Sequence, residues 1–193
     1  MKSTKYLFLF VLVPLLFCSC EEDDLTDFFS DPEIDINTSF AIPLTIDEGA
    51  NPDPNEMVGF GQIGGYDILT NPDIAEQVGE DDRIERVVIT SVTYEFRNFS
   101  GNVDANVQGT MEFPVGSGPN EVYNMPSVNA AESDLLENVY NLNGDFTSVS
   151  ERITESKNVV FSYSGTSTHN PVSFILEVIV NVRVTVRLNI DDL

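Results

Sequence analysis

The sequence lacks tryptophan and contains only one histidine, two cysteines and nine basic residues among 193. With 32 acidic residues the formal charge is −23, so the chain has no basic surface for phosphate, and this excludes nucleic acid as a partner. One histidine and two cysteines are too few for a histidine-rich or cysteine-rich metal site. The hydrophobic content of 41% is sufficient for the core of one folded domain.

The N-terminal segment has the pattern of a secretory signal. Lys2 and Lys5 precede an apolar run at residues 6–17, which is shorter than the roughly 20 residues that a membrane-spanning helix needs. The sequence Leu-Phe-Cys-Ser-Cys follows at residues 16–20. We therefore expect residues 1–19 to be removed as a signal peptide.

The junction Ser19-Cys20 resembles the lipobox of bacterial lipoproteins, in which the cysteine receives a diacylglyceryl group and becomes the first residue after cleavage. The resemblance implies that Cys20 carries a lipid anchor and that the mature chain has no intramolecular disulfide. Phe17 stands where the family usually has leucine, and Cys18 is a second candidate. The alternatives are an ordinary secretory signal cut near Ser19, or an uncleaved anchor.

The acidic run at residues 21–24 resembles the export signal that follows the lipidated cysteine in surface lipoproteins of Bacteroidetes-type bacteria. It implies an outer-membrane protein on the outer face of the cell. The alternative is a solvated tether on a protein that faces the periplasm. Residues 20–33 contain few apolar groups, which predicts a flexible acidic tether, and residues 34–193 form the single folded domain.

Alternation of apolar and polar residues predicts β-strands through most of the domain. We expect strands at 34–46, 83–99, 103–113, 121–128, from 159 onward, and at 172–190. Pro43 predicts an edge position for the first strand. The strands at 83–99 and 103–113 are expected to form a hairpin. All ten even positions of 172–190 are apolar, and a strand of about 60 Å is expected to bend or to pass between sheets.

Glycine-rich and helix-capping residues predict the remaining turns and helices. The glycine-rich segment 59–65 indicates a turn, Asn71 caps a short helix that extends to Gln77, and Asp145 caps an amphipathic helix that extends to Ser156. Together these patterns predict an all-β fold, an immunoglobulin-like antiparallel β-sandwich with one or two short helices. The chain is similar to small uncharacterised immunoglobulin-like lipoproteins of Bacteroidetes-type envelopes, and this similarity transfers no functional residue beyond Cys20.

Residues suited to catalysis do not converge in any motif. His169 lies in a polar turn with no second histidine, and no G-x-S-x-G sequence is present. The segment 59–65 lacks the lysine of a phosphate-binding loop. These observations predict a protein that is not an enzyme.

Calcium is the one metal that the composition allows, because it is bound by carboxylate and carbonyl oxygens. Between residues 20 and 82 there are 18 acidic residues and no lysine or arginine. The weak candidates in this segment are Asp47, Glu48, Asp53, Glu56, Glu80, Asp81 and Asp82. Their spacing does not match an EF-hand, and the simpler interpretation is solvated acidic loops; no other cofactor is expected.

The sequence therefore predicts a lipid-anchored, non-catalytic module of the cell envelope or cell surface, which contacts the membrane through its anchor and binds a protein or a glycan. Two alternatives remain open: a ligand carrier or enzyme with a pocket inside the sandwich, and a calcium-binding adhesion domain.

The lipobox generates the first prediction. Cys20→Ala should abolish incorporation of a palmitate analogue and release the protein from membranes, because the acyl chains would provide the membrane affinity. Cys18→Ala, with Cys20 intact, is the matched control and should be labelled normally. Undiminished labelling of Cys20→Ala would move the lipidation site to Cys18.

Overall fold

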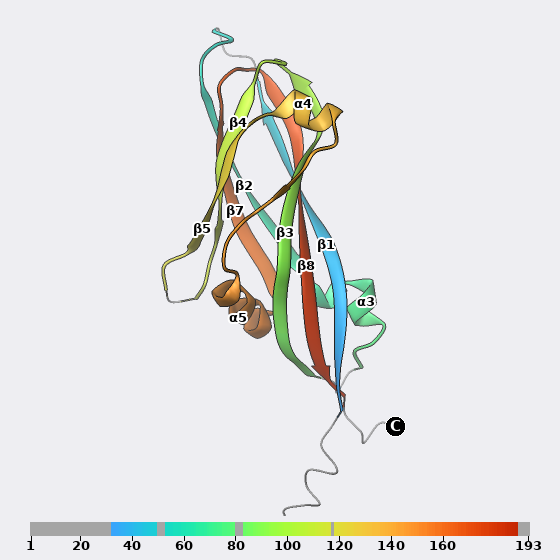
Figure 1. Cartoon of the computed structure of the whole chain (residues 1–193). Coiled ribbons are helices and arrows are strands. Elements are labelled where there is room, and N and C mark those ends of the chain that lie inside the picture. The colour runs from blue at the N-terminus through green and yellow to red at the C-terminus, as the bar shows by residue number, and fades with distance from the viewer. Residues whose placement is uncertain (1–31, 50–52, 80–82, 117, 189–193) are drawn as a thin grey trace, which may run out of the picture. The chain divides into compact units, whose positions relative to one another are not determined.

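A computed structural model describes residues 32–49, 53–79, 83–116 and 118–188 of the chain (Figure 1). The described residues from Glu33 to Leu188 belong to one compact unit. The expected signal peptide, Cys20 and the tether before Pro32 lie outside the described residues, and Glu33 is the first residue of the first strand.

In the described residues, eight strands form two four-stranded antiparallel sheets, which confirms the predicted β-sandwich. Sheet I has the order β1-β8-β3-β6 and sheet II has the order β2-β7-β4-β5. The strands are β1 (Glu33–Glu48), β2 (Val58–Asp67), β3 (Arg83–Gly101), β4 (Asn106–Phe113), β5 (Glu121–Asn129), β6 (Val139–Asn141), β7 (Asn158–Ser167) and β8 (Val172–Arg187). The helices are the 3-10 turn η2 (Ile68–Thr70) and the α-helices α3 (Pro72–Ala75), α4 (Ala130–Leu135) and α5 (Thr147–Ser156).

The strand order is that of a jelly roll. The first strand, β1, pairs with the last strand, β8. In the same way β2 pairs with β7, β3 with β6 and β4 with β5, so the chain is folded back on itself as a doubled ribbon. Jelly rolls and immunoglobulin domains share the two-layer sandwich but differ in the connections between strands. The two-layer architecture was predictable from the alternation pattern, whereas this order was not.

The predicted hairpin between the strands at 83–99 and 103–113 is wrong. β3 pairs with β8 and β6 in sheet I, whereas β4 pairs with β5 and β7 in sheet II. At the end of β3, Gly101 has a φ of +124°, and a Cβ there would lie 2.1 Å from the carbonyl oxygen of Pro171. The chain then crosses to the opposite sheet, where β4 begins at Asn106.

Of the two alternatives expected for the last strand, a bend or a passage between the sheets, the second is excluded, because β8 stays in one sheet. It stays in the middle of sheet I and pairs along its length with β1 on one side and β3 on the other. A strand of 16 residues is accommodated because its neighbours have 16 and 19 residues. The even positions of β8 are all buried, as their apolar pattern predicts.

The glycine-rich segment 59–65 is part of strand β2 and not a turn. Its glycines permit a close approach of the two sheets: a Cβ on Gly64 would lie 2.8 Å from the ring of Phe161 and 2.9 Å from Leu44. Tyr66 stacks on Phe40 of β1 at a ring-centroid distance of 4.2 Å. Glycine content alone therefore predicted a turn at a place where packing between the two sheets required a small residue.

The described residues contain three α-helices where one or two were expected; the expected cap Asn71 is confirmed, whereas Asp145 is not the N-cap of its helix. The side chain of Asn71 accepts a hydrogen bond from the backbone N–H of Asp73 at 3.0 Å, which caps α3. Phe146 occupies the N-cap position of α5, and the carboxylate of Asp145 accepts from the backbone N–H of Thr147 at 2.9 Å.

Helix α5 covers part of the free edge of β3. The hydroxyl of Ser150 accepts from the backbone N–H of Ile89 at 3.0 Å, and the hydroxyl of Thr154 accepts from the N–H of Val87 at 2.8 Å. These side chains replace the neighbouring strand that β3 lacks at this level, because β6 pairs with β3 only from Thr93 onward in the sheet.

This arrangement generates a stability prediction. Ser150→Ala leaves the N–H of Ile89 buried without its partner, which should lower the free energy of unfolding by about 1–3 kcal/mol. Ser148→Ala on the exposed face of the same helix is the control for helix propensity, and it should be neutral or slightly stabilising. Urea unfolding followed by circular dichroism measures both. Equal stability of the two variants would contradict the proposed role of Ser150.

Candidate functional site

Charged residues are distributed unequally between the two sheets. The strands of sheet I contain Glu33, Asp35, Asp47, Glu48, Arg83, Glu85, Arg86, Glu95, Arg97, Glu177, Arg183 and Arg187. The strands of sheet II contain only Asp67, Glu112 and Glu121. The strand pairing places these three residues at the same end of sheet II. The rest of its outer face is therefore uncharged, on a chain whose formal charge is −23.

A shallow hollow of about 390 Å³ lies on this uncharged outer face, across strands β4, β5 and β7. Its lining consists of Gln108, Gly109, Thr110, Asn124, Met125, Ser164, Gly165 and Thr166. The hydroxyls of Thr110 and Ser164 are hydrogen-bonded to each other at 3.0 Å across the strand pair. Amides and hydroxyls in this arrangement can donate and accept hydrogen bonds, and no charged residue is among the residues that line the hollow.

Two glycines of the lining pack closely against the core of the sandwich. Gly109 is paired with Gly165, and a Cβ on Gly109 would lie 2.6 Å from the carbonyl oxygen of Ser164. A Cβ on Gly165 would lie 2.5 Å from the ring of Phe60. This surface was not among the sites predicted from the sequence. The available signal was the complete absence of charge from residues 158–167, but only the strand pairing places that segment beside β4 and β5.

The other chemically notable group is a cluster on sheet I, where Glu95 of β3 lies directly opposite Glu177 of β8. Arg97 lies between them, with its Nη2 2.6 Å from Oε1 of Glu95 and its Nε 2.6 Å from Oε2 of Glu177. The Glu95 side chain is 9% exposed and that of Glu177 is 24% exposed. The single positive charge of the guanidinium offsets one of the two carboxylate charges, and neither carboxylate lines the hollow on sheet II.

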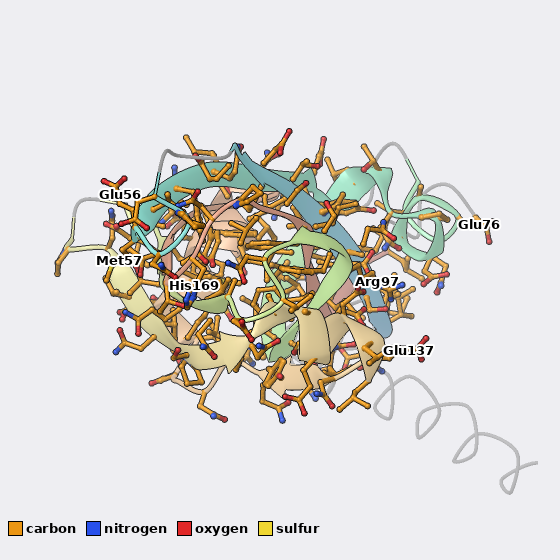
Figure 2. The ribbon with its side chains drawn as sticks, turned by 90° about the horizontal axis from the view of Figure 1, so that it is seen from above. Glu56, Met57, Glu76, Arg97, Glu137 and His169 are labelled. Carbon is orange, nitrogen blue, oxygen red and sulfur yellow. The ribbon has the colours of Figure 1, made fainter. Side chains whose placement is uncertain are left out.

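Burial raises the pKa of Glu177, and a hydrogen bond to Glu95 raises it further, whereas the charge of Arg97 opposes these effects. The hydrogen bond to Glu95 and the nearby carboxylates raise the pKa of Arg97, so the guanidinium stays charged. Glu137 is among those carboxylates, and it lies near Arg97 in Figure 2. Both carboxylates are therefore engaged in ion pairs with the same guanidinium.

The lone histidine has a structural setting. His169 lies in the turn between β7 and β8, and its Nδ1 is 2.9 Å from the hydroxyl of Thr168. The next residue, Asn170, is fully buried, and its side-chain amide donates to the carbonyl oxygens of Asp53 and Glu56 at 2.9 and 3.1 Å. This turn therefore fastens the loop before β2, and Figure 2 shows Glu56 and His169 on the same side of the domain.

The weak calcium candidates are not gathered into a site in the described part of the chain. There, no group of three or more histidine, cysteine, aspartate or glutamate side chains is placed to hold a metal ion. Asp47, Glu48, Asp53 and Glu56 are thus not brought together, and one carboxylate oxygen of Asp53 accepts from the backbone N–H of Asn55. Glu80, Asp81 and Asp82 lie outside the described residues.

The interior of the sandwich contains two tyrosine hydroxyls with no hydrogen-bond partner, those of Tyr94 and Tyr163. Burial raises the pKa of Tyr94 to about 12 and raises that of Tyr163 further still. Neither side chain lines the hollow of sheet II or the hollows beside α5. They pack as aromatic core residues, with Tyr94 stacked on Tyr140 and Tyr163 against Phe60.

The raised pKa of Glu177 predicts a pH dependence of stability. A carboxyl whose folded-state pKa lies above its unfolded value binds its proton more tightly in the folded protein. The protonated carboxyl therefore adds to the free energy of unfolding at low pH, and this stabilisation is lost as pH rises through the folded-state pKa. Glu177→Gln removes this ionisation and keeps an acceptor for Arg97. The variant should therefore be more stable than the parent at pH 7.5, by a margin that shrinks towards pH 4.5.

Thermal melts across this pH range provide the measurement. Glu76→Gln, at an exposed position of the domain, changes the net charge equally and controls for relief of general repulsion. If both variants gained the same stability at every pH, the Glu95–Glu177 pair would not be the cause.

Comparison with known proteins assigns no family to the chain. No family model and no curated protein matches it. Among solved structures, one similar chain is that of the "Crystal structure of 60-mer BFDV Capsid Protein", with 8% sequence identity, coverage of 80% of this chain and 94% of that chain, and a TM-score of 0.34. A similarity this weak carries no functional information. In the described residues no helix is long and apolar enough to span a membrane.

Proposed function

We propose that this protein is a lipid-anchored, non-catalytic binding and assembly module of the outer membrane, displayed on the cell surface. In this proposal Cys20 carries the lipid, the acidic run at residues 21–24 directs export, and the β-sandwich binds a protein partner through the outer face of sheet II. The observation that carries the binding role is the absence of charge from most of that face.

The physical support comes from the cost of burying charge. Removing a charged side chain from water costs free energy unless it is paired, and the central regions of protein interfaces are depleted of charged residues. On a chain with 32 acidic and nine basic residues, an uncharged sheet face is the surface that a partner can cover at the lowest desolvation cost. Small residues such as Gly109 and Ser164 also allow close approach of a partner.

A neutral glycan is a second candidate ligand, and the hollow supports it specifically. Gln108 and Asn124 supply amides, while Thr110, Ser164 and Thr166 supply hydroxyls that match sugar hydroxyl groups. We favour a protein partner because no aromatic side chain is among the residues of the hollow. The calcium-binding alternative has no supporting cluster in the described residues, and no carboxylate, histidine or cysteine lines the hollow of sheet II to support an enzyme with a pocket there.

A photo-crosslinking amino acid placed at Thr110 tests the binding face in the cells that make the protein. The matched control is the same amino acid at Arg183, which is exposed on the central strand of sheet I. We expect an adduct from position 110 and little from position 183, and mass spectrometry of the crosslinked peptide distinguishes an attached peptide from an attached sugar. Equal adducts from both positions, or none from position 110, would contradict the proposal.

A further inference from the structure

The two sheets have four edge strands, which differ in how they are protected. An edge strand exposes a row of unpaired backbone N–H and C=O groups, and proteins protect such edges with proline, charge, short length or a covering element. The edge strands here are β1 and β6 in sheet I, and β2 and β5 in sheet II.

Three of the four edges are protected. Pro43 interrupts β1, which also carries charges at both ends, and the amide of Asn71 donates to the carbonyl of Ser39 on that strand. Pro126 interrupts β5. β6 has only three residues, and beyond it Asp134 accepts from the backbone N–H groups of Asn98 and Phe99 of β3.

Strand β2 has none of these protections. It has ten residues, VGFGQIGGYD, with no proline and no charge before Asp67. Within the described part of the chain it pairs with β7 alone. Beside the free edge, the side chain of Ile63 is 76% exposed and that of Val160 is 46% exposed, and the β2–β7 register places both on the outer face.

We propose that β2 pairs antiparallel with β2 of a second copy of this chain, about a twofold axis through Gln62, joining two copies of sheet II into one continuous sheet. This inference rests on the strand edge, and it goes beyond the proposed function because it requires neither the lipid anchor nor the hollow. It assigns to this edge a specific occupant and a specific register.

The sequence of β2 is self-complementary in this register. With Gln62 opposite itself, Ile63 faces Gly61 of the partner subunit and Phe60 faces Gly64 of the partner subunit, whereas Tyr66 faces Val58 of the partner subunit. On the outer face the two copies of Ile63 become diagonal neighbours, at a separation that long side chains bridge. The two Gln62 amides can hydrogen-bond to each other at the axis.

A second copy meets the least charge repulsion at this edge. Two chains of charge −23 repel each other over most of their surfaces, but Val58–Tyr66 contains no charged residue. In the proposed register Asp67 lies opposite Met57 of the partner subunit and not opposite another carboxylate. The contact is isologous and closes after two copies, so that it consumes the free edge instead of propagating along it.

Disulfide trapping tests the register in the full lipidated protein. Gln62→Cys places two thiols at the axis, and we expect a disulfide-linked homodimer in membranes at a yield about tenfold above the Ala41→Cys control, since affinity differences of this order separate specific from random encounters. Ala41 is exposed near the middle of β1, the protected edge of sheet I. Equal yields from both variants would overturn the proposal.

Sedimentation of the mature chain, residues 20–193 with Cys20→Ser, provides an independent readout. Gln62→Lys places two ammonium groups at the axis and should weaken the dimer about tenfold, because like charges that face each other across an interface are costly. Ala41→Lys adds the same charge and should leave the association unchanged. A monomeric parent chain, together with a Gln62→Cys variant that forms disulfides only with other proteins, would assign the edge to a foreign strand and overturn the second copy as occupant.

The tests of the β2 dimer and of the proposed binding face give independent results. Crosslinking at Thr110 reports on β4, two strands away from the β2 edge, so either proposal can fail while the other stands.

Discussion

The pairing of the first strand with the last determines the organisation of the domain. Residue by residue, Glu33 to Glu48 of β1 lie opposite Arg187 to Val172 of β8. Once the chain ends are joined in this way, the pairs β2–β7, β3–β6 and β4–β5 follow as successive layers of one folded ribbon. β8 then lies between β1 and β3, so both of its backbone edges are satisfied and its apolar row is buried over its whole length. Such a topology places most contacts between residues distant in sequence, which is typical of slowly folding β-proteins.

Satisfying the edges of the long strands explains the short helical elements. β3 has 19 residues and β6 only three, so most of the free edge of β3 requires other hydrogen-bond partners. Side chains from α5 and α4 supply them, through Ser150, Thr154 and Asp134. The two helices therefore cover the edge of β3. Their side-chain oxygens accept the backbone hydrogen bonds that an adjacent strand accepts elsewhere in the sheet. The free edge of β2 contrasts with this consistent protection.

The distribution of charge links the fold to the proposed role. Sheet I carries charged residues of both signs on its strands, including the Glu95–Arg97–Glu177 cluster in which one guanidinium holds two carboxylates. Sheet II has its few carboxylates at one end and leaves a polar, uncharged face and an uncharged edge. On so acidic a chain, repulsion between copies and between the protein and other acidic surfaces is lowest at sheet II. Binding at the face and pairing at the edge are thus two uses of one electrostatic property.

The amino-acid sequence by itself determined the alternation of buried and exposed residues, the edge position of Pro43, the Asn71 cap and the helix ending at Ser156, because these depend on neighbours along the chain. It did not determine which strands pair, since a period of two specifies the buried face of a strand but not its partner. For this reason alternation predicts a hairpin from the strands at 83–99 and 103–113, and glycine content predicts a turn at residues 59–65, where the structure has neither. The uncharged face, the Glu95–Glu177 pair and the free β2 edge exist only through register and sheet order. Tertiary structure decided these features because each depends on residues that are far apart in the chain. Strand pairing makes these residues neighbours.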